Sequence, residues 1–130
     1  MKNDFSKHWV SSISPKKQRK YRRNADLNSK RKMLSVHLSK ELREKYKTRN
    51  LPVRKGDAVI VMRGKFAGTE GKIDRVYTKQ LKVTLDSVKA MTRKGNKVPF
   101  KFRPSSLLIK ELNVSDNWRA KRLENYGKAR

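Results

Sequence analysis

The stretch RKGDAVIVMRGKFAGTEGKI, residues 54–73, places a β-branched run directly before a cluster of three glycines. The glycines are Gly64, Gly68 and Gly71. A phosphate-binding P-loop requires G-x-x-x-x-G-K followed by Ser or Thr, and a dinucleotide-binding turn requires G-x-G-x-x-G between a strand and a helix. Here Lys72 is followed by Ile73, and the next residues favour a strand. The cluster therefore predicts a tight connection between two strands and not a nucleotide-binding loop.

Glycine at these positions permits positive φ and a close approach of other groups to the backbone. We expect the bare amides of Gly64 and Gly68 to be open to phosphate oxygens, and four neighbouring side chains to project outward. These side chains are Arg63, Lys65, Phe66 and Lys72. The connection is thus expected to present basic groups to a large anionic partner.

Short β-branched runs, several of them alternating in polarity, fill residues 56–112 and predict a small, partly open β-barrel. The predicted strands are 58–62, 72–77, 81–85, 88–91, 98–102 and 106–112. Alternation predicts two buried rows of side chains. These are Leu81, Val83 and Leu85, with Lys82 and Thr84 on the wet face, and Val98, Phe100 and Phe102. Ile73 and Val76 stand three apart, which indicates a bulge that bends the second strand.

Residues 1–55 carry a net charge of +14 and few large apolar groups, so we expect a basic extension without a core of its own. Ser14 followed by Pro15 predicts a helix start. A second helix is predicted after the N-cap Ser39 and is expected to end at residues 50–52. Its stripe of Leu38, Leu42 and Tyr46 is expected to pack on the following domain. Residues 113–130 predict a short helical tail.

The composition limits the partners. The 130 residues contain 36 Lys and Arg against 11 Asp and Glu, a formal net charge of +25. Such a charge favours an anionic partner, with nucleic acid the first candidate and an anionic membrane the second. The chain has no Cys and only two His, which disfavours a disulfide framework and a Cys/His zinc site. We expect no metal and no cofactor. No apolar run resembles a spanning helix or a signal peptide, so we expect a cytosolic protein.

The residues that form the strand-to-strand connection also resemble a KOW motif, as do those just before and after it. The motif reads Gly56-Asp57-x-Val59-x-Val61-x-x-Gly64-x-x-x-Gly68-x-x-Gly71-Lys72-Ile73-x-x-Val76. The upstream segments LSVHLSKELREKYKTRNLPVRKGD and PKKQRKYRRNA resemble one family that carries this motif, the KOW-domain L24 family of universal large-subunit ribosomal proteins in its archaeal and eukaryotic branch. The resemblance extends from about residue 15 to about residue 124. It departs from the family at Arg103-Pro104-Ser105-Ser106, where relatives usually begin with His, and at Arg93-Lys94-Gly95-Asn96, where relatives often carry an acidic tip.

The resemblance implies an SH3-like barrel and a structural role in the large ribosomal subunit. It implies binding to large-subunit rRNA in its 5′ region, near the peptide tunnel exit and beside neighbouring ribosomal proteins, and support of subunit assembly. It implies a cytoplasmic ribosomal location, with passage through the nucleolus if the source is eukaryotic. We expect no enzymatic activity, no small-molecule substrate, no membrane and no homo-oligomer.

The residues expected to contact rRNA lie on the extension, around the glycine cluster and at the hairpin tip, because phosphate contacts favour basic side chains and bare amides. They are Lys16, Lys17, Arg19, Lys20, Tyr21, Arg22, Arg23, Lys30, Arg31, Lys32, Arg54, Lys55, Arg63, Gly64, Lys65, Phe66, Gly68, Lys72, Arg93, Lys94, Lys97 and Arg103. The basic run in the extension is also compatible with a solvated tail or a nuclear-import signal.

Three other functions are open at this point. A KOW-domain transcription elongation factor that contacts RNA polymerase would need an α/β domain ahead of the barrel, which residues 1–55 cannot form. A reader of methylated tails would need an aromatic cage, for which the available rings are Phe66, Tyr77, Phe100 and Phe102. An enzyme would need paired acids from among Asp57, Asp74 and Asp86, which turn hydrogen bonds and ion pairs explain more simply.

Overall fold

The computed structural model describes residue 6 and residues 8–128, and the fold is mainly β, as predicted. In this part of the chain, seven strands form one mixed sheet in the order β2-β1-β7-β3-β4-β5-β6. The elements are α1 (Pro15–Asn24), α2 (Leu27–Met33), β1 (Ser35–Leu38), α3 (Lys40–Tyr46), β2 (Asn50–Pro52), β3 (Ala58–Val61), β4 (Glu70–Tyr77), β5 (Lys82–Met91), β6 (Lys97–Phe102), the 3-10 turn η1 (Pro104–Ser106), β7 (Leu107–Glu111) and α4 (Asn117–Lys128).

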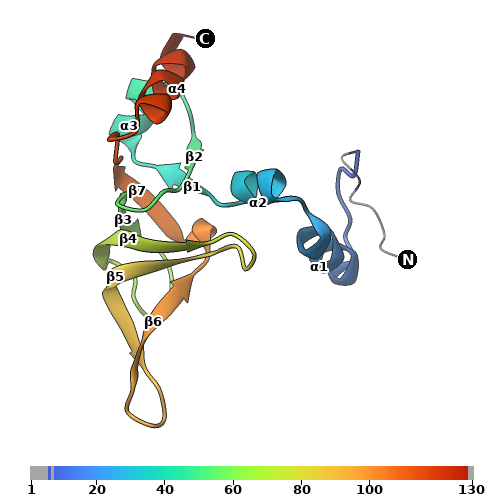
Figure 1. Ribbon diagram of the computed structural model, residues 1–130, viewed down its shortest axis with the longest axis vertical. Helices are drawn as coiled ribbons and strands as arrows, with labels where there is room; N and C mark the ends of the chain where they lie inside the picture. Colours follow the sequence, from blue (N-terminus) through green and yellow to red (C-terminus); the bar gives the residue numbers. More distant parts are fainter. Residues whose placement is uncertain (1–5, 7, 129–130) are drawn as a thin grey trace.

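The helices lie around the ends of the sheet and leave the β5–β6 hairpin on its own (Figure 1). In this view α3 and α4 lie together at one end of the molecule and the hairpin turn extends to the other. Helices α1 and α2 project to one side as an arm. No helix within residues 8–128 is long and apolar enough to cross a bilayer.

Two strands of the sheet, β1 and β2, were not predicted. Strand β1 pairs in parallel with β7, where His37 lies opposite Leu108, and antiparallel with β2, where Val36 lies opposite Leu51. Both strands are very short. Leu38 of β1 also fits the helical spacing of Leu42 and Tyr46, so it was assigned to the helix and the strand before it was missed. The predicted strands 81–85 and 88–91 are one strand, β5, with an irregular register between Thr84 and Lys89.

The core draws on every part of the chain after α2. Leu34, Val36 and Leu38 from the upstream segment are fully buried, together with side chains of the central strands and Leu123 of α4. Leu42 and Tyr46 of α3 pack against this core, as predicted for the helical stripe. Leu38, expected as its first member, is buried in the core but belongs to strand β1. The segment before residue 56 therefore contributes apolar side chains to the same core as the strands after it.

The local predictions for the helices are largely confirmed. Helix α1 begins at Pro15, and the Ser39 hydroxyl accepts a hydrogen bond from the amide of Leu42 at 3.4 Å, which caps α3. Helix α3 ends earlier than predicted, because Lys47 adopts the left-handed conformation with φ of 53°. Residues 50–52, expected to stop the helix, form β2.

The strand bulge predicted at Ile73 and Val76 is confirmed, but two expectations for side-chain burial are wrong. The register between β4 and β5 shifts between Ile73 and Arg75. Thr84, expected on the wet face, is fully buried, and its hydroxyl donates to the carbonyl of Arg75 at 3.3 Å. Val98 and Phe100, expected in the core, are exposed, because the outer part of the β5–β6 hairpin extends beyond the rest of the sheet (Figure 1).

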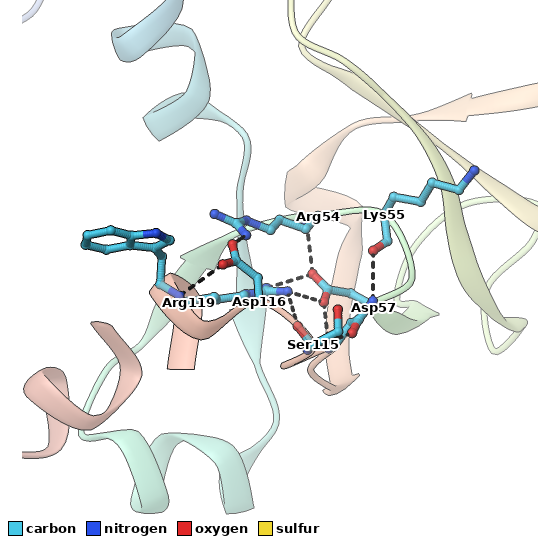
Figure 2. Close-up of polar contacts among 8 residues, drawn as sticks. Arg54, Lys55, Asp57, Ser115, Asp116 and Arg119 are labelled. Carbon is cyan, nitrogen blue, oxygen red and sulfur yellow. Dashed lines mark hydrogen bonds and ion pairs between the residues drawn. The ribbon is translucent and has the colours of Figure 1, made fainter. Parts of the chain in front are cut away.

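A buried ion pair holds α4 against the turn before β3 (Figure 2). The Asp57 carboxylate is fully buried and accepts two hydrogen bonds from the Arg119 guanidinium, at 2.6 and 2.8 Å. It also accepts hydrogen bonds from the backbone amides of Arg54 and Asn113, both at 2.9 Å. Each carboxylate oxygen thus accepts one hydrogen bond from the guanidinium and one from a backbone amide, which offsets part of the cost of burying the pair. The interpretation of Asp57 as a turn and ion-pair residue is confirmed.

Breaking this pair is expected to destabilise the whole fold. Arg119→Met keeps much of the apolar volume but leaves the Asp57 carboxylate buried without its cation, which costs about 3–5 kcal/mol. Urea unfolding followed by circular dichroism measures this loss. As the control, Lys121→Met removes an exposed charge from the same helix and is expected to change stability little. Equal unfolding midpoints for the two variants would contradict this role.

At Gly71, unlike at the other two glycines of the cluster, a neighbouring side chain leaves no room for a Cβ atom. Gly64 and Gly68 have φ of 97° and 83°, as predicted for a tight connection, whereas Gly71 lies within β4. A Cβ atom at Gly71 would lie 2.2 Å from the Ser87 hydroxyl, which itself donates to the carbonyl of Glu70 at 2.9 Å. A larger residue must therefore displace the Ser87 side chain.

This close approach predicts coupling between the two positions. Gly71→Ala is expected to lower stability by about 1–3 kcal/mol through overpacking. In a double-mutant cycle with Ser87→Ala, part of that loss is recovered, because the displaced oxygen is gone. Gly64→Ala, where nothing lies within 4 Å but φ is positive, loses stability without such coupling to Ser87→Ala. A Gly71→Ala loss that is the same with and without the Ser87 hydroxyl would refute the steric explanation.

Candidate nucleic-acid interface

The β3–β4 connection presents basic side chains, as predicted, but not its aromatic ring. Arg63 and Lys65 are exposed, and the loop is closed by a 2.8 Å hydrogen bond from the amide of Gly68 to the carbonyl of Val61. Phe66 does not project outward. Its ring packs against the core, with its centre 5.1 Å from that of Phe100 and 6.0 Å from that of Phe102.

The packing of these rings also argues against the aromatic cage that a reader of methylated tails would need. The rings of Phe66, Phe100 and Phe102 lie against one another, so they do not surround a common space for a cation. Tyr77 is outside this group, and the Lys101 ammonium lies 4.5 Å from the centre of its ring. The described residues also contain no group of three or more His, Asp or Glu side chains that could hold a metal ion.

Several positive charges line a groove between the arm and the sheet, which we call the basic groove. It has a volume of about 1060 Å³ and runs between α1 and α2 on one side and the β4–β5 turn and η1 on the other. Six basic side chains line it: Arg22, Arg23, Lys30, Lys79, Lys82 and Arg103. Asp26 is the only acidic lining residue that the described chain contributes, and its carboxylate caps α2 through the amide of Ser29.

The arm is joined to the sheet through the residue that follows α2. Ala25 between the two helices is buried, and the Lys30 ammonium donates to the carbonyl of Arg23 at 3.0 Å, which joins α2 to α1. Leu34 directly after α2 enters the core. On the opposite side, Pro104 is buried at the start of η1 and sets the position of Arg103.

Four of the predicted site residues meet in the basic groove, together with two lysines and a histidine that were not predicted. Arg22, Arg23, Lys30 and Arg103 come from the predicted set. Lys79 in the turn between two predicted strands and Lys82 on the expected wet face of the second were passed over, although a basic pair next to a turn was a usable signal. His37 was also missed, because its strand was not predicted, and its Nδ1 atom is buried without a hydrogen-bond partner in the described chain.

Three other predicted residues also lie together, but nearby carboxylates neutralise part of their positive charge. Arg31, Arg54 and Lys55 line a hollow of about 690 Å³ beside the buried ion pair. The Arg54 guanidinium contacts the Asp116 carboxylate and holds the pKa of that carboxyl below its usual value (Figure 2). The Lys55 ammonium lies 3.9 Å from Asp74. These pairs leave less positive charge here than in the basic groove.

The remaining predicted residues are dispersed over the surface. The α1 side chains Lys16, Lys17, Arg19 and Lys20, and Lys32 of α2, are exposed. Lys72 is exposed on β4, and Arg93, Lys94 and Lys97 lie at the β5–β6 turn, at the opposite end of the molecule from α4 (Figure 1). Tyr21 stacks on Trp9 with ring centres 4.1 Å apart, so Trp9 covers one face of the Tyr21 ring.

Comparison with known proteins identifies the family. Residues 12–126 match the family model of the eukaryotic ribosomal proteins L26 and their archaeal counterparts L24. The large ribosomal subunit protein uL24 of Methanospirillum hungatei is 43% identical over 114 residues, which cover 88% of this chain and 95% of the relative. The protein of the same name from Korarchaeum cryptofilum is 39% identical over 118 residues, covering 91% and 90% respectively. The chain therefore belongs to the family of the eukaryotic L26 and archaeal L24 ribosomal proteins.

Proposed function

We propose that this protein binds large-subunit rRNA and that the basic groove is its principal contact with the RNA backbone. Family membership makes the chain a structural constituent of the large ribosomal subunit, and the family is a structural and not an enzymatic one. The match includes the upstream segment as well as the central strands, so the comparisons give no support to an elongation factor.

The convergence of charge in the basic groove carries this proposal. Six cationic side chains from α1, α2, the β4–β5 turn, the start of β5 and the residue before η1 line one concave space. Among the described residues, the one carboxylate in the lining caps a helix. Like charges brought this close repel one another, and an RNA backbone that enters the groove removes that repulsion. Phosphate contacts position a protein on RNA without reading its sequence. We therefore assign this groove to recognition of a backbone of defined shape.

The other basic surfaces extend the contact to further RNA segments. Arg63 and Lys65 at the β3–β4 connection, and Arg93 and Lys94 at the hairpin tip, are exposed at places well separated from α1 (Figure 1). A protein with several separated anion-binding surfaces joins RNA segments that are distant in the nucleotide sequence. This arrangement supports a role in subunit assembly.

The finer features implied by the family are part of the same proposal. The contacts of Phe66 with the rings of Phe100 and Phe102 bring the β3–β4 connection toward β6, which favours a sheet curled into an SH3-like KOW barrel. We assign the protein to the 5′ region of the rRNA near the tunnel exit, beside neighbouring ribosomal proteins. It acts there as a single copy, in the cytoplasmic ribosome.

Salt dependence distinguishes the basic groove from general charge. The affinity falls as salt rises, and each lost phosphate contact makes the slope of log affinity against log salt shallower by about 0.7–0.9. The double variant Lys79→Gln with Lys82→Gln is therefore expected to make the slope shallower by about 1.4–1.8. The measurement is fluorescence anisotropy of a labelled fragment from the 5′ region of large-subunit rRNA. Lys40→Gln with Lys45→Gln, which removes two exposed charges from α3, is the matched control and is expected to leave the slope unchanged. Equal slopes for the two double variants would show that the groove has no special role.

A further inference from the structure

A second concave site lies between α4, α2 and β2, and it combines aromatic rings with positive charge. Its volume is about 510 Å³, within the range of small-ligand sites. The indole of Trp118 is 81% exposed and the ring of Tyr126 is 40% exposed. The buried side chains of Leu51 and Leu123 contribute the apolar part of the lining. We call this site the α4 pocket.

The polar lining of the α4 pocket selects an anionic occupant. Arg31, Lys121 and Arg122 line it, as does Arg54, which is already paired with the Asp116 carboxylate. No acidic side chain of the described residues lines the pocket itself. The Lys121 ammonium lies 6.0 Å from the centre of the Trp118 indole, so a positive charge is held beside the ring. A protein partner would have to supply several carboxylates together with an apolar side chain. A nucleotide has both the flat ring and the phosphate.

The exposure of Trp118 is imposed by the fold. Its neighbour Arg119 is fixed by the buried Asp57 carboxylate, and Leu123 on the same helix is buried in the core. Helix α4 therefore cannot rotate to bury the indole without breaking both contacts. The fold therefore keeps the indole on the surface, where a partner can reach it.

We infer that the α4 pocket binds an unpaired nucleotide of RNA, with the base stacked on Trp118 and its phosphate contacted by the surrounding cations. This inference rests on the proposed RNA-binding function and adds to it a base-contacting site separate from the basic groove. An aromatic side chain stacks on any base, so the site requires an unpaired nucleotide but not a particular sequence.

Fluorescence of Trp118 tests this in the full-length protein. Trp9→Phe leaves Trp118 as the only tryptophan, because the chain has two. Addition of single-stranded decaadenylate is expected to quench its emission, and an RNA duplex of ten base pairs to quench it much less. Trp118→Leu is expected to weaken decaadenylate binding by about 5- to 150-fold, the range for loss of one stacked base. Trp118→Phe keeps a ring and retains most of the affinity.

The controls separate the pocket from the fold and from the basic groove. Trp118→Leu is expected to leave the melting temperature unchanged, because the side chain is so exposed. Unchanged decaadenylate affinity in Trp118→Leu overturns the inference, and the proposed function still stands if the rRNA fragment binds with the expected salt dependence. Quenching by RNA-free large-subunit proteins but not by decaadenylate assigns the pocket to a protein and also overturns the inference. If neither the rRNA fragment nor decaadenylate binds, the proposed function fails as well.

Discussion

The fully buried carboxylate of Asp57 is the point at which three separate parts of the chain are joined. It accepts hydrogen bonds from the turn before β3, from the segment after β7 and from Arg119 of α4 (Figure 2). A carboxylate can be buried at acceptable cost only when its oxygens are this fully satisfied. The position of α4, and with it the orientation of Trp118, follows from this contact.

The acidic residues of this very basic protein are largely engaged within the fold, and this determines where positive charge remains. Asp57 pairs with Arg119, Asp116 with Arg54, and Glu70 with Lys110 at 3.1 Å. The exposed pairs add little stability, but they reduce the local positive charge around α4 and β4. Among the residues that the structure describes, the helix cap Asp26 is the one carboxylate that lines the basic groove, so the charge of the groove is available to an anionic partner. The basic residues that pair with carboxylates within the fold are thus different from those that line the basic groove.

Local sequence predicts much of this structure, and long-range packing accounts for the rest. The β3–β4 connection, the bulge at Ile73, the start of α1 and the cap of α3 all depend on neighbouring residues and were predictable. Strands β1 and β2 depend on pairing with each other and with the distant β7, so their few residues carried no usable pattern. Many basic side chains of the site could be predicted from the sequence simply because they are Lys or Arg. Their grouping could not, because only the folded chain brings Arg22 to the groove that contains Lys82 and Arg103.

The position of RNA relative to the arm and the sheet tests the central claim most directly. The measurement is a structure of the large ribosomal subunit that contains this protein, determined by electron cryomicroscopy. The account predicts an rRNA backbone inside the basic groove, with phosphate oxygens within hydrogen-bonding distance of Arg22, Lys82 and Arg103. A groove filled by a protein segment or by solvent, with RNA confined to the opposite face of the molecule, would contradict it.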